Sequence, residues 1–339
     1  EDRLTLYDGA EEALAFSSGM AAITTALMAY AQAGSSILYT NPLYGGTEVF
    51  IRNMLPDFGV KPFEVDATAG EIDVLEKARE AAKAGPLKVI FVETPGNPTN
   101  TLVDLEAFAR VRDTIAEETG QRPILMCDNT MMGPIGQAPL EFGVDLILYS
   151  LTKYIGGHSD LIAGGALGTT ELLAPVRRMR TYLGAVPDPH TCWMLMRSIE
   201  TVSIRMERAF ENAKVCAGFL KDHPKVENVR YLDFLPANDP QRAIYDRQCK
   251  AAGSTFSFDV KGGKEPAFRV LDNLKLVKLA VSLGGTESLI CHPGSTTHSG
   301  VPVEVRERIG FTDSLLRISI GIENAEDLVA DLEQALTHA

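Results

Sequence analysis

The first half of the chain alternates short apolar runs with longer stretches in which apolar residues recur every three or four positions. The short runs are rich in Val, Ile and Leu and predict buried strands at 35–40, 88–94, 123–129 and 144–150, with a Gly-rich candidate at 163–169. The stretches between them predict helices at 20–33, 44–58, 72–84, 105–119 and 138–142. Because the strands are apolar almost throughout and alternate with helices, we expect an α/β fold with a mostly parallel sheet covered on both faces.

The periodicity changes near residue 188. One long helical stretch is predicted over 187–223. It is followed by three strand-like runs, TFSFDV, KLAVSLG and LLRISIG, and by a terminal helix in NAEDLVADLEQALTHA. We therefore expect a large domain over 1–200 and a smaller α+β domain over 201–339. The opening stretch, EDRLTLYDGAEEALAF, has helical periodicity but no start signal, so we expect that a segment normally precedes it.

Composition and charge argue against several classes of function. The chain has 339 residues, 45% of them hydrophobic, and a formal net charge of −13. Such an acidic chain shows no basic patch for nucleic acid, and no apolar stretch of about 18 residues predicts a membrane segment. The five cysteines form no CxxC pair and the six histidines no HExxH pattern, so we expect no metal site and a reducing, cytoplasmic setting.

Polar residues follow the predicted strands where each strand ends. Ligands of a parallel α/β sheet bind beyond the carboxyl ends of its strands, so these residues are expected to gather at one site. They are Ser18, Gly19 and Met20 before the first helix, Tyr44 after the first strand, Glu93 and Asn97 after the second, Asp128 after the third, and Ser150, Thr152 and Lys153 after the fourth. Each one alone has an ordinary explanation as a turn, cap or surface residue.

Together these residues match what pyridoxal phosphate requires of a protein. A lysine links to the cofactor and moves protons, and a carboxylate keeps the pyridine nitrogen protonated so that the ring can absorb charge. N–H groups at a helix N-terminus, aided by hydroxyls, bind the phosphate, and an aromatic ring stacks on the cofactor. The candidates for these roles are Lys153, Asp128 and Tyr44, with Ser18, Gly19, Met20, Ser150 and Thr152 at the phosphate.

The chain resembles the Cys/Met-metabolism family of pyridoxal phosphate enzymes along essentially its whole length. The stretch DLILYSLTKYIGGHSD resembles the lysine signature of the family, and SSGMAA, YGGT, ETPGNPTN, CDNT and SLGGTESLICHPGSTTHS occur in the family's order. Leu151 departs from the family, in which a small residue usually precedes the Thr-Lys pair. The resemblance implies the fold-type I architecture, with a large cofactor-binding domain and a smaller C-terminal domain.

The resemblance also implies roles for single residues. Lys153 is expected to hold the cofactor covalently, Asp128 to pair with the ring nitrogen, and Tyr44 to stack on the ring and help to move protons. Asn97 is expected to reach the ring hydroxyl or the substrate carboxylate, and Glu93 to organise the polar network around it. The phosphate ligands are expected to be Gly19, Met20, Ser150 and Thr152.

Substrate contacts are expected from the second domain. Arg317, on a predicted strand, is expected to bind the substrate carboxylate, because a guanidinium pairs with a carboxylate through two parallel hydrogen bonds. Ser282 is expected to contact the same carboxylate through its backbone. Three histidines, His158, His292 and His298, are expected to be supporting residues near the lysine loop and the substrate.

The resemblance leaves several reactions open. Val281 occupies a position where family members acting on cystathionine often carry a glutamate, which favours γ-elimination from methionine to a thiol, ammonia and 2-oxobutanoate. Gly46, in contrast, lies where methionine-cleaving members typically have a cysteine. Action on cystathionine, as a γ-lyase or γ-synthase, and O-acyl-homoserine sulfhydrylation are the alternatives. A nucleotide-dependent oxidoreductase is disfavoured because no G-x-G-x-x-G follows the early strands, and a non-catalytic relative because Lys153 and Asp128 are both present.

The phosphate site predicts an oligomer. None of its motifs contains an arginine, although a phosphate is nearly dianionic at neutral pH and calls for a charged partner. The resemblance implies that a tyrosine and an arginine of an N-terminal arm complete this site across a dimer. We expect that this arm precedes residue 1, and that the active unit is a homo-oligomer, a dimer of dimers.

Overall fold

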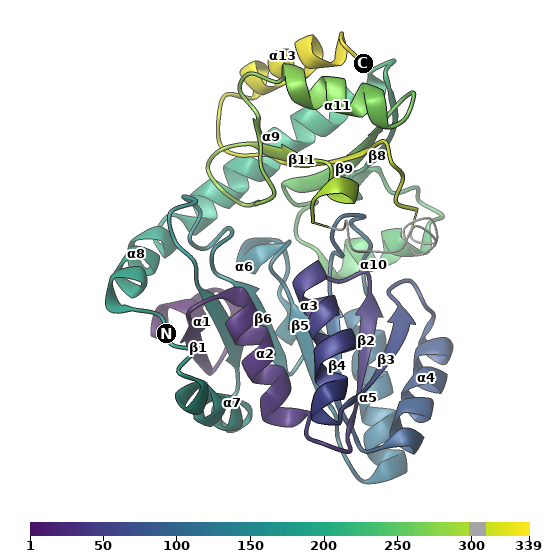
Figure 1. Cartoon of the computed structure of the whole chain (residues 1–339), viewed down its shortest axis with the longest axis vertical. Helices are drawn as coiled ribbons and strands as arrows, with labels where there is room; N and C mark the ends of the chain where they lie inside the picture. The colour runs from purple at the N-terminus through teal and green to yellow at the C-terminus, as the bar shows by residue number, and fades with distance from the viewer. Residues whose placement is uncertain (298–309) are drawn as a thin grey trace.

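The computed structural model describes residues 1–297 and 310–339, which fold around two sheets (Figure 1). The first sheet has seven strands in the order β1-β7-β6-β5-β4-β2-β3, and the second has five in the order β10-β11-β12-β9-β8. Strands of the first sheet come from residues 12–168 and those of the second from 226–319. The expected α/β architecture with a smaller α+β region after it is confirmed.

The first sheet is parallel except for one strand. Strand β7 runs antiparallel to both of its neighbours, β1 and β6, whereas the remaining pairs are parallel. The strands are β1 (Glu12–Phe16), β2 (Ser36–Asn41), β3 (Lys61–Asp66), β4 (Leu87–Glu93), β5 (Ile124–Asp128), β6 (Leu146–Ser150) and β7 (Gly164–Gly168). The five strands expected in this half are confirmed to within two residues. Strands buried on both faces are apolar along their whole length, so they are easy to identify in the sequence.

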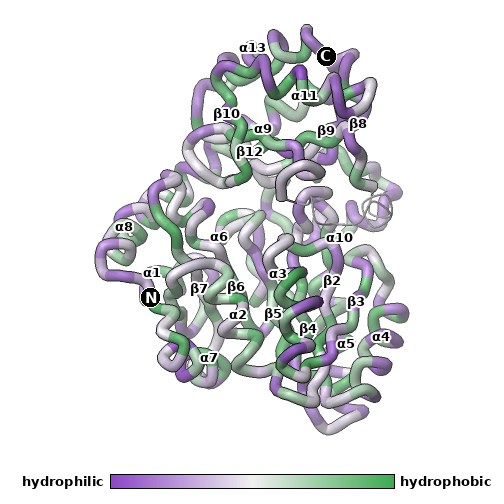
Figure 2. The backbone as a smooth tube through the Cα atoms, viewed as in Figure 1, coloured by the Kyte–Doolittle hydropathy of each residue, from purple (hydrophilic) through white to green (hydrophobic). Residues whose placement is uncertain are grey.

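Helices cover both faces of the first sheet. Along β4, Val89 and Phe91 belong to an apolar cluster that includes residues of α2 and α7. Ile90 and Val92 belong to a second cluster, on the opposite face, that includes residues of α4 and α5, as the two-residue period of a strand requires. Apolar residues accordingly concentrate along the central strands and α2 (Figure 2). The helices of this region are α1 (Asp2–Asp8), α2 (Gly19–Tyr30), α3 (Gly45–Val49), α4 (Glu71–Ala84), α5 (Leu105–Thr119), α6 (Gly133–Gly136), α7 (Thr170–Leu183) and α8 (Pro189–Ile199).

Helices α9, α11 and α13 pack together against one face of the second sheet. Phe256 and Phe258 of β9 point into the apolar core beneath these helices, while Thr255 and Ser257 point to the opposite, polar face. Its strands are β8 (Val226–Arg230), β9 (Thr255–Val260), β10 (Lys278–Leu279), β11 (Leu289–Cys291) and β12 (Leu315–Ser319). The helices of the described part are α9 (Val202–Asp222), α10 (Pro240–Gln248), α11 (Lys264–Asn273) and α13 (Ala325–Leu336).

Three expectations about local structure are corrected. The helical periodicity of the opening stretch ends at Asp8, and residues 12–16 form β1, because pairing with β7 buries the alanines and leucine of EALAF. The expected helix over 44–58 is a short α-helix followed by a π-helical turn at Phe50–Met54 and a 3₁₀ turn at Leu55–Phe58. The long helical stretch breaks after Ile199, and we propose this break as the boundary between the two domains.

A chain of buried polar side chains runs beneath the first sheet's carboxyl edge. The Tyr149 hydroxyl donates to Asp8 Oδ1 (2.9 Å) and accepts from Asn129 Nδ2 (2.8 Å), and Asn129 Oδ1 accepts from Gln137 Nε2 (3.1 Å). Burial raises the pKa of Asp8 to about 7. This network ties the N-terminal helix to the residue that follows Asp128.

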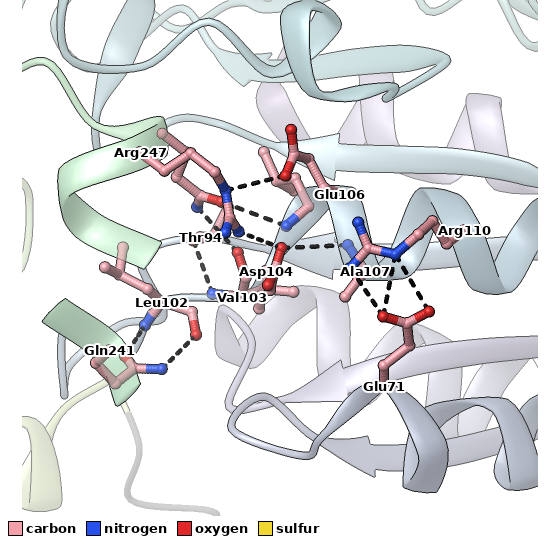
Figure 3. Close-up of polar contacts among 12 residues, drawn as sticks. Glu71, Thr94, Leu102, Val103, Asp104, Glu106, Ala107, Arg110, Gln241 and Arg247 are labelled. Atoms are coloured by element: carbon pink, nitrogen blue, oxygen red, sulfur yellow. Dashed lines mark hydrogen bonds and ion pairs between the residues drawn. The ribbon is translucent and has the colours of Figure 1, made fainter. Parts of the chain in front are cut away.

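Helix α10 joins the second region to the start of α5 (Figure 3). The Gln241 side chain accepts from the Leu102 N–H (2.6 Å) and donates to the Leu102 carbonyl (2.9 Å). Arg247 pairs with Asp104 (2.5 Å) and Glu106 (3.1 Å). These contacts fix the segment that leads out of β4.

No helix in the described ranges combines the length and apolarity needed to cross a bilayer.

Candidate active site

A cavity of about 240 Å³ lies beyond the carboxyl ends of β4, β5 and β6 and is closed on its far side by the second sheet. The structure brings the predicted site residues together around it, although they come from both halves of the chain. Those that line it are Ser18, Gly19, Met20, Tyr44, Glu93, Asn97, Asp128, Ser150, Thr152, Lys153, Val281 and Arg317. Ser282 does not line the cavity itself but contacts two residues that do.

Lys153 lies in the turn that follows β6. Its N–H donates to the Ser150 carbonyl (3.2 Å) and its own carbonyl accepts from Gly157 (2.7 Å), so the backbone turns sharply and aims the side chain into the cavity. Its Nζ donates to Ser282 Oγ (3.1 Å). Burial, with a smaller contribution from the Arg317 charge, lowers the pKa of Lys153 to about 8. A neutral amine, which can act as a nucleophile or base, is therefore accessible near neutral pH.

Two carboxylates meet at the ends of neighbouring strands. Glu93 of β4 and Asp128 of β5 are register partners and both are buried. Asp128 Oδ1 accepts from the Thr130 N–H (3.0 Å), and Glu93 Oε2 accepts from the Tyr44 N–H (2.6 Å). Burial raises the pKa of Glu93, and the Asp128 charge raises it further; burial alone raises the pKa of Asp128. A cation beside Asp128 would favour the charged form of its carboxyl.

The N-terminus of α2 forms one end of the cavity. Ser18 caps the helix by accepting from the Ala21 N–H (3.0 Å), and the N–H groups of Gly19 and Met20 have no helical carbonyl to which they could donate. A Cβ atom at Gly19 would lie 2.8 Å from the Cβ of Ser150, so only glycine allows this close approach. These N–H groups and hydroxyls suit an anion.

Thr152 makes a different contribution from the one expected. Its hydroxyl donates to the Ala163 carbonyl (3.2 Å) and accepts from the Ala163 N–H (3.1 Å). Because a hydroxyl has a single hydrogen, Thr152 would have to exchange its bond to Ala163 before it could donate to a phosphate. Its role at the phosphate stays a prediction.

Tyr44 stands at the mouth of the cavity with 44% of its surface exposed. A Cβ atom at Gly46 would lie 2.8 Å from the Tyr44 ring and 3.2 Å from Met20 Sδ. The absence of a side chain at Gly46 therefore leaves room for the Tyr44 ring in this position.

Arg317 forms the wall opposite the strand ends. Its Nη1 donates to Asn97 Oδ1 (3.3 Å), and its Nη2 donates to the carbonyls of Val281 (2.6 Å) and Ser282 (3.1 Å). Its Nε is buried and has no partner among the described residues. An unpaired donor on a buried guanidinium is costly, and a carboxylate in the cavity would satisfy it.

Several lining residues were not among the predicted site residues. The Thr130 hydroxyl accepts from the Ser150 N–H (2.8 Å), which joins the ends of β5 and β6. Thr130 could have been identified from the sequence, because it follows a predicted strand. The apolar residues of the lining could not, because in the sequence they have the pattern of core residues. These are Ile23, Met131, Ile162 and Leu283, and Thr297 also lines the cavity.

The histidines differ in their contributions. His158 Nδ1 lies 2.7 Å from the Gly156 carbonyl, in the turn after Lys153, as expected of a supporting residue. His292 does not line the cavity, since its ring lies against Phe268 and its nitrogens contact Ser295 Oγ and the Asp313 carbonyl. His298 lies outside the described residues.

The arrangement fits pyridoxal phosphate. Three features that the cofactor requires surround one cavity. They are an amine of lowered pKa at Lys153, a buried carboxylate at the strand end, and a helix N-terminus at which Gly19 has no side chain. Arg317, whose Nε is buried and unpaired among the described residues, lines the same cavity. No group of three or more potential metal ligands occurs within residues 1–297 and 310–339.

Comparisons with known proteins place the chain in a family. The family model described as "Cys/Met metabolism PLP-dependent enzyme" matches residues 1–337. The chain is 40% identical to an L-methionine γ-lyase of Fusobacterium nucleatum over 338 residues, covering 99% of this chain and 82% of that protein. It is also 40% identical to the cystathionine γ-lyase of Sus scrofa over 340 residues, covering 100% of this chain and 80% of that one.

A solved structure of cystathionine γ-synthase from Xanthomonas oryzae in complex with cystathionine is similar throughout. Its TM-score is 0.90 at 34% identity, and the match covers 99% of this chain and 83% of that one. Matches of this extent and identity, together with the assembled site, leave one assignment: the chain belongs to the family of Cys/Met-metabolism PLP-dependent enzymes.

Proposed function

We propose that this enzyme catalyses γ-elimination from a sulfur amino acid, with L-methionine as its substrate. The observation that carries the proposal is the chemistry of the cavity wall. Within the described lining, the only carboxylates are Glu93 and Asp128, which neighbour each other at the strand ends. On the side of the second sheet the lining includes the apolar residues Val281 and Leu283, beside Arg317. A methyl thioether suits such a wall, whereas the distal ammonium of cystathionine would lack a partner there.

Each polar residue of the site has a distinct task in this reaction. Pyridoxal phosphate, when bound, supplies an aldehyde that links to amines and a ring that absorbs negative charge. Lys153 holds the cofactor and, as a free amine, takes the α-proton of the substrate. Asp128 keeps the ring nitrogen protonated, and Arg317 orients the substrate by its carboxylate. The Tyr44 hydroxyl returns a proton to the departing sulfur, so that methionine and water yield methanethiol, ammonia and 2-oxobutanoate.

Action on cystathionine is the second candidate, favoured by the equal identity to a cystathionine γ-lyase. Steady-state rates separate the two. We expect a higher kcat/KM with methionine than with cystathionine in the parent enzyme. Val281→Glu should lower the ratio of the two kcat/KM values at least about tenfold, because a carboxylate would pair with the distal ammonium.

Val281→Leu is the matched control, since it keeps the wall apolar and should leave the ratio within about twofold. Two results would speak against the assignment of methionine: a parent enzyme that prefers cystathionine, or a glutamate variant whose ratio equals that of the leucine variant.

We also propose that the active unit is a homo-oligomer. Large apolar side chains are exposed on helices α1, α7 and α8 and on the segment that joins α7 to α8, on one side of the first sheet (Figure 1). They are Leu6, Tyr182, Leu183, Val186, Trp193 and Met196. A second copy would cover this apolar face. Lys153 and Arg317 are the only cations of the described lining, and neither is assigned to the phosphate. We therefore propose that a second copy supplies the charged partner of the phosphate.

Sedimentation velocity tests this arrangement. The parent should sediment as a dimer or larger assembly, and Trp193→Asp should shift it toward the monomer and lower its activity, because a charge placed in an apolar interface loses its hydration. Ile204→Asp, at an apolar position on α9 that is more exposed than Trp193, is the control and should not dissociate the enzyme. A fully active monomer would refute the proposal.

A further inference from the structure

The loop of residues 96–101, here named the docking loop, is the place where the strand-end side of the site meets the second sheet. Its base is closed by a hydrogen bond from the Gly96 N–H to the Thr101 carbonyl (2.7 Å) and by one from the Asn100 N–H to the Gly96 carbonyl (2.9 Å). The loop carries Asn97, whose side chain accepts from Arg317. The position of this loop therefore sets where one partner of Arg317 lies.

One row of residues across the second sheet contacts the docking loop at successive points. Arg317 of β12, Ser257 of β9 and Arg230 of β8 are register partners in adjacent strands. Beside the Arg317 contact, Ser257 Oγ donates to the Pro98 carbonyl (2.7 Å). Further along, Asn100 Nδ2 donates to the Arg230 carbonyl (3.2 Å). These three contacts with the loop lie along one transverse row of the sheet.

Burial increases the free-energy cost of breaking these hydrogen bonds. The Ser257 side chain is fully buried, and Asn100 is buried with a second hydrogen bond from its Nδ2 to the Thr255 carbonyl (3.0 Å). A buried polar group that loses its partner pays the full cost of desolvation, so each contact opposes a shift of the loop. Neither residue lines the cavity, and both can affect the substrate only through the loop.

We propose that Ser257 and Asn100 are positioning residues for amino-acid binding: they hold the docking loop so that Asn97 and Arg317 together receive the α-carboxylate. The inference rests on the carboxylate-binding role proposed above for Arg317. It concerns the carboxylate that all amino acids share and does not depend on which sulfur compound is cleaved.

The test compares two small ligands of the holoenzyme by titration of the visible absorbance of the bound cofactor. Glycine carries an amine and a carboxylate, and methylamine carries the amine alone. Ser257→Ala removes one hydroxyl. Asn100→Gly removes the side-chain amide and keeps the backbone, because Asn100 has φ 59° and glycine adopts that conformation freely. Each variant should weaken glycine binding about fivefold, the effect of one typical hydrogen bond, and leave methylamine binding unchanged.

Ser36→Ala is the matched control. Ser36 is also fully buried and donates its hydroxyl to backbone carbonyls, those of Ala81 (2.8 Å) and Gly85 (3.1 Å), at the opposite edge of the first sheet. It should lower the melting temperature about as much as Ser257→Ala and leave both ligands unaffected. If only one of the two loop variants folds, that variant decides the outcome.

Two results would overturn the proposal. In the first, the loop variants bind glycine as tightly as the parent, which would make the contacts purely structural. In the second, glycine and methylamine weaken equally, which would place the effect at the cofactor. A parent that binds glycine selectively but does not cleave methionine would instead refute the proposed substrate and leave this inference intact.

Discussion

Lys153→Ala is expected to lower the turnover of any sulfur amino acid by at least about a thousandfold. General acid–base catalysis alone is worth roughly 10²–10⁴-fold, and the substitution also removes the covalent attachment of the cofactor. Within the described lining of the cavity, Lys153 is the only lysine. Another primary amine is therefore not in place to substitute for it.

Reduction of the holoenzyme with borohydride, followed by peptide mass spectrometry, separates attachment from turnover. The parent should carry the cofactor mass on the peptide that contains Lys153, and the variant should carry it nowhere. Lys214→Ala, which changes an exposed lysine on α9, should behave like the parent in both assays. A cofactor adduct at a different lysine, or turnover near the parent rate, would remove Lys153 from its role.

Asp128→Asn is expected to lower kcat by roughly a hundredfold or more while the protein stays folded. The neutral amide cannot hold a proton on the ring nitrogen, so the ring loses much of its capacity to absorb charge. Burial raises the pKa of the Asp128 carboxyl, which means that the charged form is held at a cost in the cofactor-free protein. Removal of that charge should leave the melting temperature of the cofactor-free protein unchanged or raise it.

Asp145→Asn is the control and should show the opposite pattern, with stability lost and activity kept. The Asp145 side chain is only 9% exposed, but it pairs with Arg112 (3.1 Å) and Arg122 (2.8 Å) and accepts from the Leu125 N–H (2.8 Å). Its loss should destabilise the protein by about 2 kcal/mol or more and preserve the specific activity of the folded fraction. If Asp128→Asn followed this second pattern, its carboxylate would be structural.

The sequence was sufficient for the central strands and for the residues at their ends. Buried parallel strands must be apolar on both faces, so β2, β4, β5 and β6 stand out as continuous runs. The carboxyl ends of parallel strands meet at one edge, so the sequence alone was enough to place Asp128 and Lys153 at a common site. The motifs around them then indicated the family, which the comparisons confirm.

Only the tertiary structure decided the features that depend on long-range pairing. EALAF is a strand because β7 lies beside it, and its local pattern alone favoured a helix. Arg317 and Asn97 are 220 positions apart, and their contact depends on how the second sheet meets the docking loop. Ser257 has the pattern of an ordinary strand residue, and only its register with Arg317 places it over Pro98. Local periodicity records which face of an element is buried, but the energy of a buried hydrogen bond depends on the partner that the fold brings to it.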